Sequence, residues 1–425
     1  MTLPRLCIRK KDIWDYLIVY LTLLQVFFLN WLNINLTLLI SFMIVCTVFI
    51  RLRYYLTYTK FMQGIFLIGA YLFVHYVFIG GNIALLIQNG GMIGMRICIC
   101  YYFVTLISRK QEFVVHLMEN LCVIFNLYAM LNIPVIMLQL MGHYELAARG
   151  MNLSSFMWED MVSGLFGLYG TPYMATYFSF LIVYNYELLS KEHNIRIHRS
   201  LLKLFNICLL IFICIVSLYN DNKGFYIIFL SFILVYYLIK IIAKNEKRNI
   251  LIKLLNIIKN IVPIVSILLV ALFIAYKYTP FKKTVDMIER IIVNATSDRI
   301  IAGSSERIAM VLYALKNPEI RWLGAGLGKY GMKQSGALGF LHFGQSDLGA
   351  FWCLGGTLLV ICIFVIMGMI LRHVFNDNLI IAIEILLLLL LLIFTNVLTA
   401  TSITVSYVLY VMTCWLCIRR ISTKK

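Results

Sequence analysis

The chain is dominated by apolar runs of about 20 residues, each separated from the next by a short polar or basic segment. A helical run of that length matches the thickness of a lipid bilayer. Hydrophobic residues make up 62% of the 425 residues and charged residues only 13%, a balance outside the range of soluble domains. The sequence therefore predicts an all-α, polytopic membrane protein.

Clusters of Lys and Arg and polar breaks divide these runs into twelve predicted transmembrane helices. Alternate threading from a cytoplasmic N-terminus places most of the 37 Lys and Arg residues inside, and the short outer connections then hold only Arg149 and Lys223. Both termini are therefore predicted to be cytoplasmic. The predicted spans are residues 13–32, 34–50, 61–79, 84–107, 113–140, 172–189, 202–219, 224–243, 260–276, 347–371, 379–397 and 400–418.

The net charge of +18 would suggest nucleic acid as a partner of a soluble protein. Here the basic residues lie in short clusters between apolar runs, which membrane orientation explains better. The eleven cysteines are scattered, almost all within apolar runs, so we expect no disulfide framework and interpret Cys414 and Cys417 as helix residues. The basic start, Met1 to Lys11, leads straight into an apolar run and is interpreted as part of an uncleaved first span.

The chain is expected to divide into three parts. Residues 1–276 hold the first nine spans with an outer segment at about 141–171, residues 277–346 form a large outer loop, and residues 347–425 hold the last three spans and a basic tail. Within the loop, Ile308, Val311, Leu312 and Leu315 predict one apolar helix face, which Pro318 ends; Ser304 or Ser305 is the expected N-cap. An ordered loop of this length is usually functional.

Two arginines are candidates for binding an anion. Arg96 lies near the middle of the fourth span, where a cation costs at least about 2.5–3.5 kcal/mol unless water, an anion or a partner compensates it. Arg307 stands in the first turn of the loop helix, where the helix dipole disfavours a cation and a bound anion would reverse that cost. The alternatives are structural hydrogen bonds in the bundle for Arg96, and pairing with Glu306 or Asp298 for Arg307.

A second group of polar residues lies where the loop meets the tenth span. His342 precedes Gln345, Ser346 and Asp347, which places an imidazole, an amide, a hydroxyl and a carboxylate at the membrane surface. Histidine and carboxylate side chains serve as general acids and bases, although a lone interfacial histidine is more often inert. Lys223 lies in a tight outer turn and either contacts a phosphate or sugar or simply solvates the turn.

Several signatures point away from other functions. Residues 324–331 contain a literal GxGxxG, but no strand precedes it, so we interpret its glycines as tight turns that let the loop pack close to the bundle. The chain has no GxxxxGK[ST], no HExxH and no Asp-x-Asp pair for a metal-bound nucleotide sugar. We therefore expect cationic side chains, rather than a metal, to carry any polar chemistry.

An ordered set of short motifs covers roughly residues 160–365: Gly167…Pro172, Lys223-Gly224, Ser305-Glu306-Arg307, Pro318, Gly324-Ala-Gly326-Leu-Gly328, His342 and Gly355-Gly356. In this set the chain resembles the O-antigen polymerase and O-antigen ligase superfamily. The family commonly has Arg-Gly where this chain has Lys223-Gly224. Its ligases typically show a histidine followed by Asn, Ser or Gln, whereas His342 is followed by Phe343. The departure at His342, a longer gap from it to Gly355 and the sequence Ser346-Asp347-Leu348-Gly349 favour a polymerase, whereas Lys223 keeps the cation and loses the bidentate fork of arginine.

The resemblance implies a metal-independent, cofactor-free glycosyltransferase of the bacterial cytoplasmic membrane, which polymerises undecaprenyl-diphosphate-linked repeat units of O-antigen, capsule or exopolysaccharide at its outer face. Family arginines are held to grip the diphosphate, and Arg307 matches one of them. We expect Arg307, Lys223 and Arg96 to stabilise the charge that develops on the diphosphate. Candidate proton acceptors are Asp347, His342 and Glu306. Further predicted substrate contacts are Ser305, Gly326, Gln345 and Tyr169.

Two alternatives to a polymerase remain open. One is an O-antigen ligase that transfers finished glycan to a lipid or protein acceptor. The other is a lipid-linked oligosaccharide flippase or secondary transporter, although such proteins usually show two related halves and binding groups at mid-membrane. The expected partners are lipid-linked oligosaccharides and membrane lipid, with a flippase and a chain-length regulator as protein partners and no nucleic acid.

Overall fold

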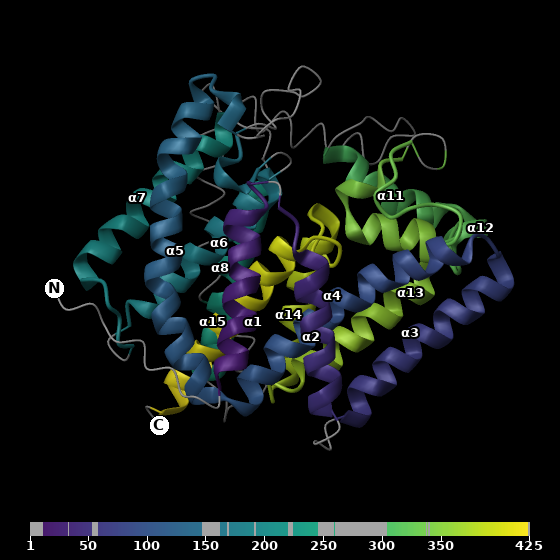
Figure 1. Ribbon diagram of the computed structural model, residues 1–425, viewed down its shortest axis with the longest axis horizontal. Coiled ribbons are helices and arrows are strands. Elements are labelled where there is room, and N and C mark those ends of the chain that lie inside the picture. The colour runs from purple at the N-terminus through teal and green to yellow at the C-terminus, as the bar shows by residue number, and fades with distance from the viewer. Residues whose placement is uncertain are drawn as a thin grey trace.

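The computed structural model (Figure 1) describes residues 12–32, 34–52, 58–146, 162–167, 170–190, 193–219, 224–244, 259, 304–336, 338 and 341–423. The predicted ninth span, 260–276, and the start of the large loop lie outside these residues. Every described element of regular structure is helical apart from one isolated bridge residue, Leu341. The described part of the chain is therefore all-α.

Thirteen α-helices are found in the described residues, joined by short 3₁₀ and π-helical turns. They are α1 (Ile13–Leu24), α2 (Thr37–Leu52), α3 (Tyr58–Ile79), α4 (Ile83–Arg109), α5 (Gln111–Leu140), α6 (Thr171–Leu188), α7 (Arg199–Tyr219), α8 (Gly224–Lys244), α11 (Ser304–Lys316), α12 (Pro318–Arg321), α13 (Asp347–Leu371), α14 (Asn378–Phe394) and α15 (Thr401–Thr423).

Six of the described helices are long and apolar enough to cross a membrane by length and composition, namely α4, α5, α7, α8, α13 and α15. Shorter apolar helical stretches occur in α1, α2, α3 and α14. These properties indicate a multi-pass membrane protein. A helix is present at each predicted span that the structure describes, with ends that differ by a few residues.

Two span boundaries differ from the sequence prediction for identifiable reasons. The first span, expected as one helix over 13–32, changes to a π-helix at Gln25–Leu29, where the buried Gln25 side chain accepts the Leu36 N–H at 2.7 Å and holds the following turn. The predicted span 379–397 extends three residues beyond the end of α14 at Phe394, because the backbone of Thr395 is extended (φ −145°, ψ 179°). Thr395 to Ala400 then form a polar connection to α15.

The almost fully buried α15 is the central helix of the described bundle. It packs against α4, α6 and α8, and its Tyr410 hydroxyl donates a 2.8 Å hydrogen bond to the Phe232 carbonyl of α8. In contrast, α7 lies at the left-hand edge of the bundle and α3 at the right-hand edge (Figure 1), and both expose apolar side chains as lipid contact requires. The core of the described bundle is thus built around its last helix.

The helix predicted in the large loop is present, but its buried face differs from the expected one. Pro318 follows the end of α11 and begins the short helix α12 at its first turn, as expected of a proline. The buried residues of α11 are Ala309, Met310 and Ala314, whereas Leu315 is exposed. Ala309 and Ala314 let α11 approach α13 closely and Met310 packs beside Gly349 of α13, while Ile308, Val311 and Leu312 are only half-buried.

The glycine-rich segment after α12 packs against helices instead of projecting into solvent. Gly324 has a φ of +77°, and an added Cβ would lie 2.3 Å from the Leu354 carbonyl group. The N–H groups of Ala325 and Gly326 donate to the Cys353 and Leu354 carbonyls at 2.8 and 3.1 Å. On the other side of the contact, Gly356 breaks the helical geometry of α13 with a φ of +68°. The expected close packing of these glycines is confirmed.

Candidate functional site

Arg96 is buried in the middle of α4, facing helix α2. Its Nη1 donates to the Ser41 hydroxyl at 3.3 Å, while its Nε is buried without a hydrogen-bond partner among the described residues. The guanidinium also lies within electrostatic range of Asp347 and Tyr173. A buried cation with an unused donor and one carboxylate in reach is the arrangement that an anionic ligand would complete.

Asp347 begins α13 and is also buried. Its carboxylate accepts hydrogen bonds from the Leu398 N–H at 2.6 Å and the Thr399 hydroxyl at 2.5 Å, and both partners belong to the connection between α14 and α15. The preceding Ser346 caps α13 through the Gly349 N–H at 3.1 Å. Asp347 therefore ties three helix ends together within electrostatic range of Arg96, and its assignment as a proton acceptor stays a prediction.

Lys333 belongs to the same electrostatic neighbourhood, although the sequence did not point to it. The residue is exposed, but protein atoms surround much of its ammonium group, and this partial desolvation lowers the pKa of Lys333 below its usual value. Repulsion from Arg96 lowers the pKa further, while attraction to Asp347 opposes the shift. Two cations and one carboxylate thus gather from α4, the loop and α13.

Arg307 lies half-buried in the first turn of α11, as expected. Its Nη1 donates a 2.7 Å hydrogen bond to the carbonyl of Phe394, and Phe394 is the last residue of α14. The C-terminal end of a helix carries unsatisfied carbonyl groups and partial negative charge. The end of α14 therefore offsets the unfavourable position of this cation at the start of α11.

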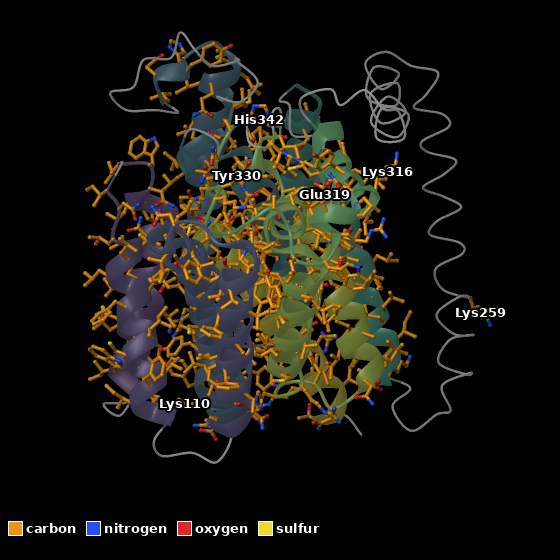
Figure 2. The ribbon with its side chains drawn as sticks, turned by 90° about the vertical axis from the view of Figure 1, so that its right-hand side faces the viewer. Lys110, Lys259, Lys316, Glu319, Tyr330 and His342 are labelled. Carbon is orange, nitrogen blue, oxygen red and sulfur yellow. The ribbon has the colours of Figure 1, made fainter. Side chains whose placement is uncertain are left out.

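The segment from His342 to Gln345 lies beside the polar connection between α14 and α15. His342 is half-buried and precedes a 3₁₀ turn over Phe343–Gln345 (Figure 2). The Asn396 amide donates to the Gly344 carbonyl, while the side-chain oxygens of Gln345 and Asn396 are buried without a hydrogen-bond partner among the described residues. Leaving such groups unpaired costs about 1–3 kcal/mol each, which a polar ligand would recover.

The remaining predicted site residues are only partly described. Tyr169 and Lys223 lie outside the described residues, and so do the side chains of Ser305 and Glu306, although both belong to α11. Gly326, predicted to contact substrate, has a φ of +126° and donates its N–H to the Leu354 carbonyl. Its described contacts are those of a packed turn, and a substrate contact stays a prediction.

Helices α3 and α4 hold the glycine-rich segment through side chains that the sequence analysis did not select. The Asn89 amide donates to the Leu327 and Tyr330 carbonyls at 2.7 and 2.9 Å, and the Leu327 N–H lies 2.9 Å from Nε2 of His75. Nδ1 of His75 lies 3.0 Å from the Tyr71 hydroxyl. Polar residues within apolar helices are the signal that would have identified them.

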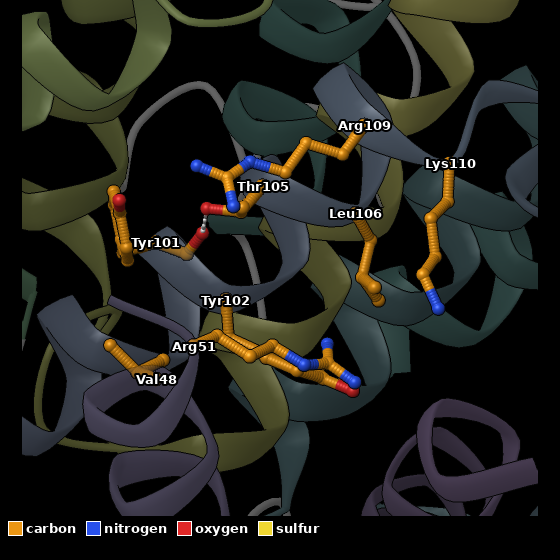
Figure 3. Close-up of a pocket in the computed structure, with 8 residues that line it drawn as sticks. All are labelled: Val48, Arg51, Tyr101, Tyr102, Thr105, Leu106, Arg109 and Lys110. Carbon is orange, nitrogen blue, oxygen red and sulfur yellow. Dashed lines mark hydrogen bonds between the residues drawn. The ribbon is translucent and has the colours of Figure 1, made fainter. Parts of the chain in front are cut away.

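A separate cavity lies at the opposite end of α4. It measures about 220 Å³ and is lined by Arg51, Tyr102, Arg109 and Lys110 together with Val48, Tyr101, Thr105 and Leu106 (Figure 3). Lys110 bonds Asp12 and Asp15 at 2.6 Å. Figure 2 shows Lys110 at one end of the molecule and His342 and Tyr330 toward the other, so this cavity is distinct from the Arg96 neighbourhood.

Within the described residues, no group of three or more His, Cys, Asp or Glu side chains is placed to hold a metal ion. A scan against protein-family models finds no match to this chain, and a search of curated proteins finds no significant sequence relative.

Proposed function

We propose that the protein is an integral membrane glycosyltransferase that polymerises undecaprenyl-diphosphate-linked oligosaccharide repeat units at the outer face of a bacterial cytoplasmic membrane. The observation that supports this proposal most is the electrostatic neighbourhood of buried Arg96, buried Asp347 and the partly desolvated ammonium of Lys333, where the large loop enters the bundle. A dense, doubly charged group such as a diphosphate suits such a cationic neighbourhood.

In this proposal the cations act on the leaving group. Breaking the bond between sugar and diphosphate leaves growing negative charge on the phosphate oxygens, and positive groups already in place stabilise it without reorganisation. Arg96 and Lys333 take this role, with Arg307 and Lys223 as further donors. Asp347 or His342 accepts the proton of the attacking hydroxyl, and the unpaired side-chain oxygens of Gln345 and Asn396 accept hydrogen bonds from sugar hydroxyls and so orient them.

The proposed topology has twelve spans, cytoplasmic termini and the large loop outside. It is supported by the bias of Lys and Arg along the chain and by the helices at each described predicted span. The loop enters the bundle through buried, irregular backbone, which is tolerated in a membrane protein where protein atoms satisfy it. A flippase would supply the substrate, and a chain-length regulator would act beside the polymerase.

The proposal is tested by complementing a strain that lacks this gene and separating its surface glycan by gel electrophoresis. Arg96→Gln should lower the polymerisation rate about 10- to 100-fold, the loss expected for a charge-assisted contact of about 1.5–3 kcal/mol, and thus shorten the polymer. Arg372→Gln, an exposed cation at the far end of α13, is the matched control. Both variants must reach the membrane at the wild-type level.

Full-length polymer in Arg96→Gln would contradict the proposed role of this residue. The same strain also separates polymerase from ligase. Loss of a polymerase leaves single repeat units attached to the acceptor, whereas loss of a ligase leaves lipid-linked polymer unattached. Unattached polymer in the deletion strain would overturn the polymerase assignment.

A further inference from the structure

A second cationic cavity lies among helices α6, α7, α8 and α15. It measures about 590 Å³, and its charged and amide-bearing lining residues are Arg199, Lys203, Asn206, Lys240 and Arg420. The predicted topology places these parts of α7, α8 and α15 on the cytoplasmic side, as it does Lys110. No acidic residue lines this cavity in the described part of the chain.

Two of the four cations are engaged by the protein itself. Arg199 donates to the Leu189, Ser190 and His193 carbonyls at 2.5–2.9 Å and so shapes the connection between α6 and α7. Arg420 pairs at 3.1 Å with Glu187, which is fully buried. These interactions hold the wall of the cavity in place, and the Glu187 carboxylate is already paired with Arg420.

The other two cations retain their charge for a ligand. Neither Lys203 nor Lys240 has an ion pair among the described residues. Lys203 is exposed, and the Lys240 ammonium lies over the rings of Tyr186 and Tyr237, 5.2 and 5.8 Å from their centroids. Aromatic rings beside a lysine at a helix end are typical of the interface between lipid headgroups and acyl chains.

An exposed apolar stripe continues from this cavity along α7. Ile207 lines the cavity and is 49% exposed, and Leu204, Ile211 and Ile215 are exposed at helical spacing on the same side. The cavity therefore joins a cationic end to an apolar track. A free phosphate ion would contact only the cationic end, whereas a phospholipid would contact the cationic end with its headgroup and the apolar stripe with an acyl chain.

We propose that this cavity binds the headgroup phosphate of an anionic phospholipid from the inner leaflet, with one acyl chain along the exposed stripe of α7. Lys203 and Lys240 contact the phosphate, and Asn206 supplies a neighbouring amide. The lipid fills the space between α7 and α8. This proposal depends on the interpretation of the chain as a multi-pass membrane protein with the predicted topology, and it is independent of the glycosyltransferase proposal.

Native mass spectrometry of the full-length protein in detergent, titrated with phosphatidylglycerol, tests the site. Each lysine near anionic lipid contributes about 1 kcal/mol, so Lys203→Gln with Lys240→Gln should weaken binding at this site about 30-fold. The control, Arg196→Gln with Arg372→Gln, removes two exposed cations outside the cavity and should bind like the wild type. Thermal unfolding confirms that both double variants are folded.

Two further titrations identify the source of the phosphate. Phosphatidylcholine should bind with markedly lower affinity, and millimolar inorganic phosphate should not displace phosphatidylglycerol. Equal affinity of the lysine variant and the wild type, equal binding of phosphatidylcholine, or displacement by inorganic phosphate would each overturn the proposal. If the lysine variant does not fold, single Lys203→Gln, at an exposed position, should still weaken binding about fivefold, and no loss would overturn the proposal.

Discussion

Arg96 illustrates what a single residue reveals before a structure is known. Its charge within an apolar run showed that some compensating group must exist. The structure supplies two such groups, Ser41 from α2 and Asp347 from α13, both distant from Arg96 in sequence. Neither could be predicted, because no local pattern encodes which helix ends meet. Lys333 was missed for the same reason, since a loop lysine looks solvated until its neighbours are known.

The lowered pKa of Lys333 makes a prediction about pH. In the proposed role Lys333 acts as a cation, so substrate binding should weaken as pH rises through its pKa. Because that pKa lies below the usual 10.5, the decline should begin at a lower pH than an ordinary lysine would give. Lys333→Arg, whose guanidinium stays charged, should extend activity to higher pH.

The measurement is the initial rate of polymerisation against pH, using purified protein and lipid-linked repeat units at subsaturating concentration. Lys316→Arg, in the exposed last turn of α11, is the control and should keep the wild-type profile. If Lys333→Arg declines at the same pH as the wild type, Lys333 does not contribute as a cation to binding.

Glu384 is a buried carboxyl in α14 that the sequence analysis did not select. Both of its oxygens are buried without an ordinary hydrogen-bond partner among the described residues, near the Cys414 thiol and within electrostatic range of Tyr407 and Tyr410. An ionised group would be costly there. Glu384→Gln should therefore change the free energy of unfolding by no more than about 1 kcal/mol, whereas Glu384→Ala should lose about 2–4 kcal/mol through its cavity.

Unfolding of the two Glu384 variants in detergent, followed by tryptophan fluorescence, measures the difference. A loss of more than about 3 kcal/mol in Glu384→Gln would show that the carboxyl makes an essential ionic interaction, and the explanation by burial would fail.

At the scale of elements, the positions of the helices along the chain could be predicted from the sequence. The faces through which the helices contact one another could be predicted least. Apolar runs located each described span, and Pro318 correctly ended α11. On the predicted apolar face of α11, Ile308, Val311 and Leu312 are half-buried and Leu315 is exposed. The buried residues among those described in α11 are instead Ala309, Met310 and Ala314, and α11 packs against α13. The predicted packing role of the glycines was confirmed, but which backbone they approach depended on the unpredicted break at Gly356.

The contact between the glycine-rich segment and α13 predicts an effect on stability. Gly324→Ala combines a positive φ with a Cβ that would lie 2.3 Å from the Leu354 carbonyl, so we expect a loss of at least about 3 kcal/mol. Gly336→Ala is the matched control, since Gly336 has a φ of +67° and open space around it. Its loss should be about 1–2 kcal/mol, the cost of the conformation alone.

Thermal unfolding and limited trypsin digestion compare the two glycine variants. Gly324→Ala should also expose the segment around Lys329 to trypsin, because the segment no longer packs against α13. Equal losses in both variants would mean that backbone conformation, and not steric contact, determines the effect.

For the whole molecule, the sequence indicated the class of fold, whereas the arrangement of helices came only from the structure. Hydropathy and charge bias predicted an all-helical, multi-pass chain, and six long apolar helices support this class. Nothing in the sequence indicated that α15 would be central or that α7 would lie at the edge. Such placement depends on long-range packing, which composition and periodicity do not specify.

The proposed topology predicts that both ends of the chain face the cytoplasm. Green fluorescent protein fused after Lys425 should fluoresce, and alkaline phosphatase at the same point should be inactive. Alkaline phosphatase inserted after Gln334, in the large loop, should be active and serves as the control for the outer side. An active C-terminal phosphatase fusion would place the C-terminus outside the cytoplasm, and the proposed topology would fail.

The central position of α15 also bears on the order in which the protein assembles. Ribosomes make α4, α6 and α8 before α15, although these are the helices that α15 packs against. Until translation reaches α15, its earlier neighbours are present in the bilayer with their mutual contacts incomplete. A late nonsense codon would thus remove the helix around which the others gather, and quality-control proteases should degrade the shortened product.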